Sequence, residues 1–204
     1  MATHLALLRG INLGGRNKVP MAELREVVTS LGYTGVTTYI QSGNVLFTTP
    51  DTDPAKLASA LEAAITGTFG LTVSVVVLSR DDLAQILDRN PYRAEPNPKL
   101  VHVVFLNAEL PPELLDRVQA AESAVAAKGS RDTVTALGPA LYLHTPDGFG
   151  TSELAQVVLR ILGATGKTAA GGTGGTDPPG QHRIVATARN WSTSTKLLSL
   201  CEET

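Results

Sequence analysis

The segment VTTYIQSGNVLFTT, residues 36–49, contains two runs rich in β-branched and aromatic residues. Such runs favour strands, and Gln41, Ser42 and Gly43 between them suit a short hairpin turn. The segment therefore predicts a β-hairpin. The elements on each side of this hairpin decide the fold, because a hairpin between two helices is typical of a split β-α-β sheet.

A strand and a helix are predicted on each side of the hairpin. Before it, THLALLR (residues 3–9) is a nearly continuous apolar run, and residues 20–31 repeat apolar side chains at helical spacing. After it, Asp53 is a suitable N-cap for a second helix, and TVSVVVL (residues 72–78) suits a strand. The order over residues 1–78 is therefore β-α-β-β-α-β, which predicts a ferredoxin-like half.

This topology also predicts which strands are neighbours in the sheet. In a ferredoxin-like sheet, residues 5–9 and 45–48 form adjacent central strands. Residues 36–40 and 73–78 then lie at the two edges.

The same order of elements returns later in the chain. Residues 79–98 are predicted to be a helical linker, since Ser79 can cap a short helix that three prolines then end. Residues 99–188 repeat the β-α-β-β-α-β order, with RIVATA (residues 183–188) as the last strand. Residues 189–204 form a C-terminal helix. The predicted fold class is α+β, with two tandem ferredoxin-like halves.

One segment of the second half departs from this pattern. Residues 163–182 contain seven glycines and two prolines, with almost no large apolar side chain. This composition cannot offset chain entropy by burial, so we expect a poorly packed loop whose deletion leaves the fold intact. GATGKT within it is not a phosphate-binding loop, because Ile161 stands where that motif requires glycine.

Composition restricts the classes of partner. The chain has 17 Lys and Arg against 19 Asp and Glu, a net charge of -2, so nucleic-acid contact requires a local basic patch. Aromatic residues make up 4%, which leaves few side chains for stacking bases. No apolar run is long enough to span a membrane, and the N-terminal segment does not resemble a signal peptide.

Cysteine content indicates the compartment. The single cysteine, Cys201, excludes an internal disulfide and is expected to be an inert buried thiol on the last helix. We therefore expect a cytoplasmic protein.

Three polar clusters are candidates for a binding site. The loop at residues 10–19 can direct backbone N–H groups and cations at an anion, the QSGN turn at residues 41–44 adds amides and a hydroxyl, and ARNW at residues 188–191 adds a guanidinium. The candidate ligand-binding residues are Arg9, Asn12, Lys18, Gln41, Ser42, Asn44, Arg189 and Asn190.

Each cluster also has a purely structural interpretation. The glycines permit a tight turn while Asn12 ties the loop to itself, and QSGN is a hairpin turn. Asn190 caps the last helix and Trp191 anchors it. If the clusters form one site, Arg189 is an exposed cation whose removal changes stability little. A structural role instead predicts Arg189 buried against backbone carbonyls.

No catalytic group is identified from the pattern. The four histidines show no paired metal spacing, so no metal and no cofactor are predicted. His144 and Asp147 form an acid–base pair in one interpretation, whereas Asp147 only shapes a turn in the other. Ser42 lies in no nucleophile motif, and catalytic residues remain unknown.

Three stretches together resemble a known family: LLRGINLGGRNKVPM (residues 7–21), TYIQSGNVLF (38–47) and TARNWSTSTKL (187–197). They are similar to the bacterial family catalogued as domain of unknown function 1697, and YLHTPDGFGTSEL (142–154) also fits it. The resemblance implies two ferredoxin-like halves and brings no established reaction.

Two features depart from the family pattern. Thr151 and Glu153 flank Ser152 where members typically carry a basic pair, and residues 163–182 look like an insertion.

The sequence supports one leading functional hypothesis and two alternatives. The leading hypothesis is a binding protein for a phosphate-bearing small molecule or a nucleic-acid element. An RNA-recognition mode is weakly supported, since the predicted strands lack paired aromatic residues. The alternatives are an enzyme of unrecognised class that uses the same surface, and a protein-interaction module; the oligomeric state is not indicated.

Overall fold

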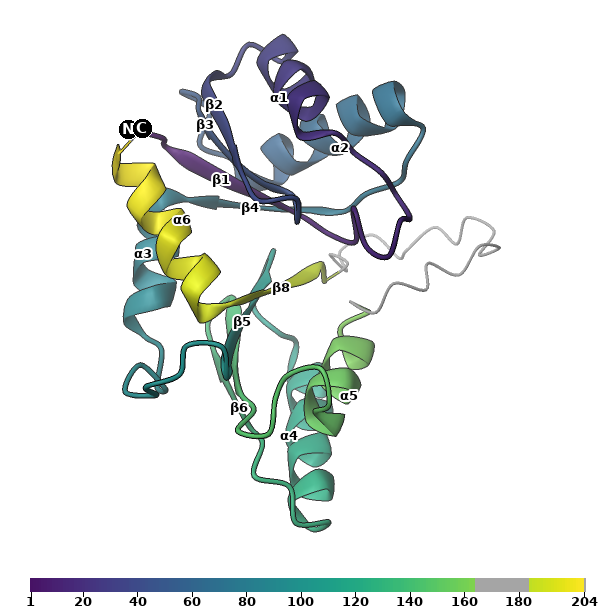
Figure 1. Cartoon of the computed structure of the whole chain (residues 1–204), viewed down its shortest axis with the longest axis vertical. Helices are drawn as coiled ribbons and strands as arrows, with labels where there is room; N and C mark the ends of the chain where they lie inside the picture. Colours follow the sequence, from purple (N-terminus) through teal and green to yellow (C-terminus); the bar gives the residue numbers. More distant parts are fainter. Residues whose placement is uncertain (164–183, 204) are drawn as a thin grey trace.

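The computed structural model describes residues 1–163 and 184–203, so residues 164–182 of the glycine-rich segment lie outside the described residues. The described part is a mixed α+β structure with two four-stranded antiparallel sheets and six helices (Figure 1). The first sheet contains β1 (His4–Leu8), β2 (Thr34–Tyr39), β3 (Asn44–Thr48) and β4 (Val75–Ser79). The second contains β5 (Val101–Leu106), β6 (Thr133–Leu137), β7 (Ala140–His144) and β8 (Ala186–Asn190).

The strand order of the first sheet is β2-β3-β1-β4, and that of the second is β6-β7-β5-β8. The central position of β1 and β3 confirms the prediction made from the hairpin. β1 pairs with β3 in a register that places Leu5 opposite Leu46, and with β4 in one that places Leu5 opposite Leu78. β2 and β4 are the edges of this sheet, as expected.

The helices are α1 (Met21–Ser30), α2 (Pro54–Phe69), α3 (Arg80–Asp88), α4 (Pro112–Ala126), α5 (Glu153–Ile161) and α6 (Trp191–Glu203). Local signals explain where several of them begin. The Asp53 carboxylate accepts hydrogen bonds from the N–H groups of Ala55 and Lys56, and the Ser79 hydroxyl accepts one from Asp82. Both predicted caps are therefore confirmed.

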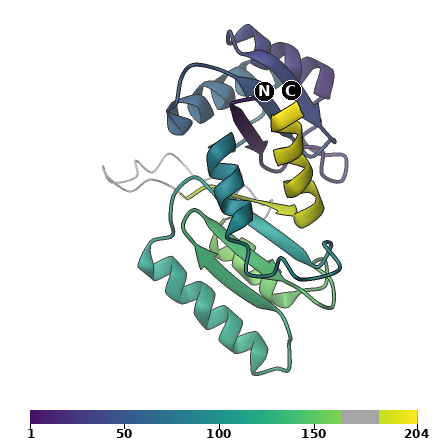
Figure 2. The ribbon, with the colours of Figure 1, turned by 90° about the vertical axis from the view of Figure 1, so that its left-hand side faces the viewer.

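The molecule is layered around the two sheets. α1 and α2 cover one face of the first sheet, and α4 and α5 cover one face of the second (Figures 1 and 2). The two remaining faces look toward each other, with α3 and α6 packed side by side at one end. In β1, Leu5 and Leu7 face this central layer whereas Ala6 and Leu8 face the helices, because successive strand residues point to opposite faces.

One apolar cluster joins the two sheets, and we call it the central core. It includes Leu7 and Val76 from the first sheet, Phe105 and Tyr142 from the second, and Leu197 from α6. The Tyr142 hydroxyl also donates a 2.6 Å hydrogen bond to the carbonyl of Ile86 in α3. The chain termini meet near this layer, where the N–H of Ala2 bonds to the carbonyl of Cys201 at 3.0 Å.

The last strand differs from its predicted bounds. It was expected at residues 183–188 but runs over Ala186–Asn190, because pairing with β5 continues until Asn190 lies opposite His102. Arg189 and Asn190 are therefore strand residues, and α6 begins at Trp191. Asn190 nevertheless caps α6, since its side-chain oxygen accepts a 2.8 Å hydrogen bond from the N–H of Thr193.

Candidate functional site

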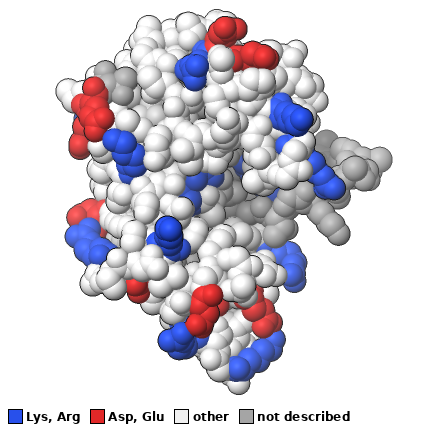
Figure 3. Space-filling view, viewed as in Figure 1, with Lys and Arg blue, Asp and Glu red and all other residues white. Residues whose placement is uncertain are grey.

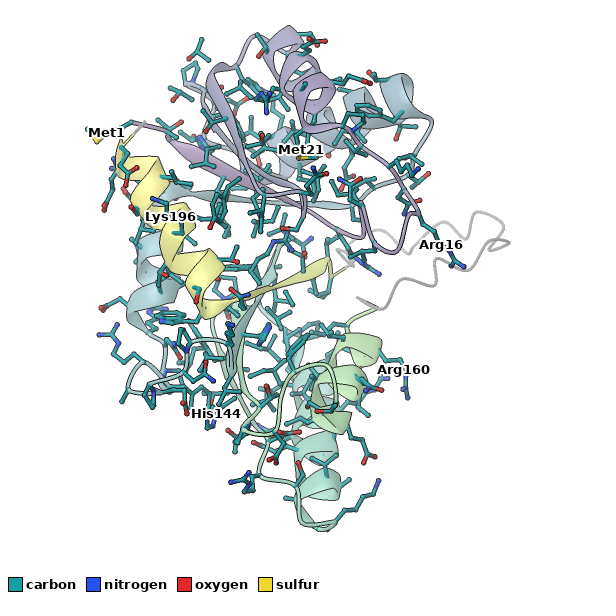
Figure 4. The ribbon with its side chains drawn as sticks, in the orientation of Figure 1. Met1, Arg16, Met21, His144, Arg160 and Lys196 are labelled. Carbon is teal, nitrogen blue, oxygen red and sulfur yellow. The ribbon has the colours of Figure 1, made fainter. Side chains whose placement is uncertain are left out.

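The glycine-rich loop after β1 is a closed and anchored structure. The N–H of Asn12 bonds to the carbonyl of Asn17 at 3.0 Å, and the N–H of Arg16 bonds to the carbonyl of Leu13 at 3.0 Å. The Asn17 amide donates back to the carbonyl of Gly10 at 2.9 Å. These bonds hold residues 10–17 as a small hairpin that carries Arg16 at its outer end, pointing away from the body of the protein (Figure 4).

Asn12 joins this loop to the turn between β2 and β3. Its amide nitrogen donates to the carbonyl of Val19 at 3.0 Å and to that of Gln41 at 2.9 Å. Its side-chain oxygen accepts from the N–H of Val19 at 2.9 Å. The loop and the turn thus form one surface, which we call the loop platform and define as residues 10–18 and 39–44.

The loop platform contains the unusual backbone of this chain. Among the described residues, the non-glycine residues with positive φ are Asn12 (53°), Asn17 (48°) and Ile40 (50°), and all three lie in the platform. Asn tolerates this conformation, but a β-branched residue does so at a cost of about 1–2 kcal/mol. Ile40 gains little packing there, since 49% of its surface is exposed.

The outer surface of the platform combines cations with exposed apolar groups. Arg16, Lys18 and Gln41 are exposed, and Leu13 is 62% exposed beside them in sequence. Residues 9–22 and 34–50 contain no Asp or Glu. Arg160 of α5 lies on the same flank of the molecule as Arg16, and blue Lys and Arg groups appear along this flank (Figures 3 and 4).

Arg189 reaches the platform from the second sheet. Its Nη2 donates to the carbonyls of Leu8 at 3.0 Å and Ser42 at 2.9 Å. Its Nε donates to the side-chain oxygen of Asn44 at 2.6 Å. Its Nη1 donates within its own strand, to the Thr187 hydroxyl at 2.8 Å and the carbonyl of Ala188 at 2.9 Å.

The expectation that Arg189 is an exposed cation is therefore wrong. Only 9% of its surface is exposed, and burial lowers the pKa of its guanidinium to about 10, so the group remains charged at neutral pH. The contacts are those of the structural alternative, with backbone carbonyls as acceptors. Arg189 nevertheless brings the ARNW segment against the QSGN turn, which a single site formed by these clusters would require.

The other candidate residues divide into anchors and exposed groups. Asn44 is fully buried, and its amide nitrogen donates to the carbonyl of Tyr39 at 2.9 Å and to the Ser42 hydroxyl at 3.0 Å. Asn190 follows Arg189 in the strand, so it points to the opposite face and serves as the cap of α6. Arg9 and Ser42 are half-buried, whereas Lys18 and Gln41 are exposed.

Sequence reasoning left Leu13 and Ile40 out of the candidate set. Leu13 had a signal, because it is a large apolar residue isolated in a polar glycine-rich loop. Ile40 had none, since a β-branched residue at the end of a β-rich run predicts extended backbone.

His144 does not pair with Asp147. Its Nε2 lies 2.8 Å from a carboxylate oxygen of Glu95, while Asp147 accepts a hydrogen bond from Arg131. Two hydrogen bonds, first from the backbone of Asn97 and then from His144, lower the pKa of Glu95. The acid–base interpretation of His144 and Asp147 is therefore wrong for this structure.

Other titratable groups lie away from the platform. His102 stacks on Phe149 with ring centroids 3.7 Å apart, and burial lowers its pKa to about 4. The Cys201 thiol is buried, which raises its pKa to about 11, as expected of an inert thiol.

In residues 1–163 and 184–203, no cluster of three His, Cys, Asp or Glu side chains is placed to hold a metal ion. No helix in these ranges is long and apolar enough to cross a membrane.

Fold and site together define a class: a two-sheet α+β protein with an acid-free, cation-bearing loop surface. A family model described as "Protein of unknown function (DUF1697)" matches residues 1–141, and the chain belongs to this family. The chain is also similar to the conserved bacterial protein SP0830 from Streptococcus pneumoniae. That solved structure has a TM-score of 0.66 and 25% sequence identity, over 99% of each chain. A search of curated proteins found no match.

Proposed function

We propose that the chain binds a phosphate-bearing ligand through the loop platform. One observation carries the proposal: every non-glycine residue with positive φ among the described residues lies in this surface. Of these three residues, Ile40 carries the strained backbone. Such strain persists where the surrounding structure enforces it, and it gathers at ligand-binding sites. The hydrogen bonds of Asn12 and Arg189 supply that enforcement here.

Local charge supports an anionic ligand. Arg9, Arg16 and Lys18 lie in or beside the platform, and the two stretches that form it contain no carboxylate. The chain as a whole has a net charge of -2, so the positive charge of these two stretches contrasts with the net charge of the whole chain. Arg and Lys recognise phosphate by charge and hydrogen bonding, and Arg16 and Lys18 are exposed to do so.

The platform favours binding over catalysis. Residues 10–18 and 39–44 contain no Asp, Glu, His or Cys, so Lys18, Tyr39 and Ser42 are the groups of the platform that could act in acid–base or nucleophilic chemistry. A carboxylate, imidazole or thiol for catalysis would have to reach the ligand from outside these residues. A protein-interaction role is supported only by the exposed Leu13 and Ile40.

The test measures the binding of two probes by calorimetry. Pyrophosphate represents a small phosphate compound, and a 20-nucleotide single-stranded RNA represents a nucleic-acid element. A small-molecule site binds pyrophosphate at least as tightly as RNA. A nucleic-acid site binds RNA more tightly, with an affinity that falls steeply with salt.

Arg16→Ala combined with Lys18→Ala should weaken the preferred probe about tenfold or more, since two charge-assisted contacts are lost. Lys128→Ala is the matched control, because Lys128 is an exposed cation beyond α4 that pairs with Glu153. The affinity of the Lys128→Ala variant for the same probe should stay within about twofold of wild type. The proposal fails if wild-type protein binds neither probe, or if both variants behave alike.

We also infer a ferredoxin-like topology for each half, residues 1–78 and 99–188, with residues 79–98 as a linker. The strand orders β2-β3-β1-β4 and β6-β7-β5-β8 support this inference. A cytoplasmic location is proposed on the single, buried cysteine.

A further inference from the structure

We infer that Arg189 is a positioning residue, through which the second sheet sets the shape and charge of the loop platform. The inference rests on the proposed function, and it assigns Arg189 no contact with the ligand. It makes phosphate binding depend on how the two sheets dock.

Two supports hold the turn between β2 and β3. Ser42 of the turn and Asn44, the first residue of β3, accept hydrogen bonds from Arg189, while Gln41 accepts one from Asn12. The turn is therefore held from the loop on one side and from the second sheet on the other. Removing either support frees the backbone on which Ile40 and Gln41 are displayed.

The guanidinium of Arg189 is a planar fork of hydrogen-bond donors. Five N–H groups in one plane meet acceptors on both sheets: Leu8, Ser42 and Asn44 on the first, Thr187 and Ala188 on the second. Lysine carries the same charge on a single rotatable ammonium and cannot satisfy this set. The arrangement thus depends on arginine and not merely on a cation.

Arg189 is a buried cation bound by neutral groups. Among the described residues, every acceptor that Arg189 contacts is neutral, and no ion pair includes Arg189. A buried charge without a counter-charge is costly, even where neutral groups satisfy its hydrogen bonds. A phosphate group on the platform would supply the compensating negative charge.

The experiment compares Arg189→Lys with Tyr142→Phe and wild type. Tyr142→Phe is the matched control, because it removes another buried hydrogen bond of the central core, one whose acceptor, the carbonyl of Ile86, lies outside the platform. Pyrophosphate affinity is measured at a temperature where all three proteins are folded. Amide NMR shifts of Gln41 and Gly43 report the turn directly.

Arg189→Lys should lower pyrophosphate affinity about tenfold and shift the Gln41 and Gly43 amides, since the charge stays but the fork is lost. Tyr142→Phe should keep affinity within about twofold, with little shift at the turn. If Arg189→Lys is less stable but binds like wild type, Arg189 is only structural and the inference is overturned.

Two further outcomes separate this inference from the proposed function. If wild-type protein binds no phosphate probe, the proposed function fails. The NMR shifts then still decide whether Arg189 positions the turn. If Arg189→Lys does not fold, Thr187→Val removes one acceptor of the fork. That variant should bind pyrophosphate about twofold to threefold more weakly than wild type. If its affinity equals that of wild type, the inference is overturned.

Discussion

At the scale of single residues, Gly43 occupies a position where no side chain fits. A Cβ placed there would lie 2.7 Å from Cβ of Leu8 and 2.9 Å from Cδ1 of Ile11, at a φ of +77°. Gly43→Ala should therefore lower the free energy of unfolding by about 2–4 kcal/mol, through overpacking and strained backbone together. Urea denaturation measures this change.

Two other glycines separate the causes of that loss. Gly14 also has a positive φ, of +54°, but a Cβ added there would meet no atom within 4 Å, so Gly14→Ala should cost about 1 kcal/mol from strain alone. Gly67 lies inside α2 with open space around it, and Gly67→Ala should stabilise by about 0.5–1 kcal/mol. If Gly43→Ala and Gly14→Ala lower the free energy of unfolding equally, the close approach of Gly43 to Leu8 is unimportant.

At the scale of elements, the turn between β2 and β3 contains a residue, Ile40, whose backbone conformation lowers the stability of the protein. Ile40 has a φ of 50° and 49% exposure, so its side chain contributes little packing and strains the backbone. Ile40→Asn should raise the free energy of unfolding by about 0.5–1 kcal/mol, because Asn adopts this conformation readily.

Leu137→Asn is the control, since Leu137 is 38% exposed at the end of β6 without a positive φ. That change should leave the protein equally stable or less stable. A loss of stability in Ile40→Asn would mean that Ile40 packs more productively than its exposure indicates.

At the scale of the whole molecule, the central core links the two sheets into one cooperative unit. Leu7, Phe105 and Leu197 belong to this single cluster although they come from β1, β5 and α6. We predict one thermal transition, with matching midpoints by circular dichroism and by Trp191 fluorescence. Leu197→Ala should lower both midpoints together, at a cost of about 2–5 kcal/mol. Two separate transitions would show that the sheets fold independently.

Sequence by itself determined the elements and the order of strands. The reason is local: apolar periodicity, the caps at Asp53 and Ser79, and the turn at residues 41–43 each act over a few residues. The same local chemistry offered structural roles for Asn12 and Asn190 beside their candidacy as ligand-binding residues. Hydrogen bonds between Asn12 and Val19, within the loop, and from the N–H of Thr193 to Asn190 bear the structural roles out. The strand order followed because few topologies connect these elements.

Only the tertiary structure decided what Arg189 does. Its acceptors Leu8 and Ser42 are distant in sequence, so nothing around residue 189 distinguishes an exposed cation from a buried one. Ile40 is a second case, since its backbone conformation opposes its intrinsic preference and is imposed by the joined loop and turn. Both residues are defined by contacts between segments that meet only after folding, and a local pattern carries no record of such contacts.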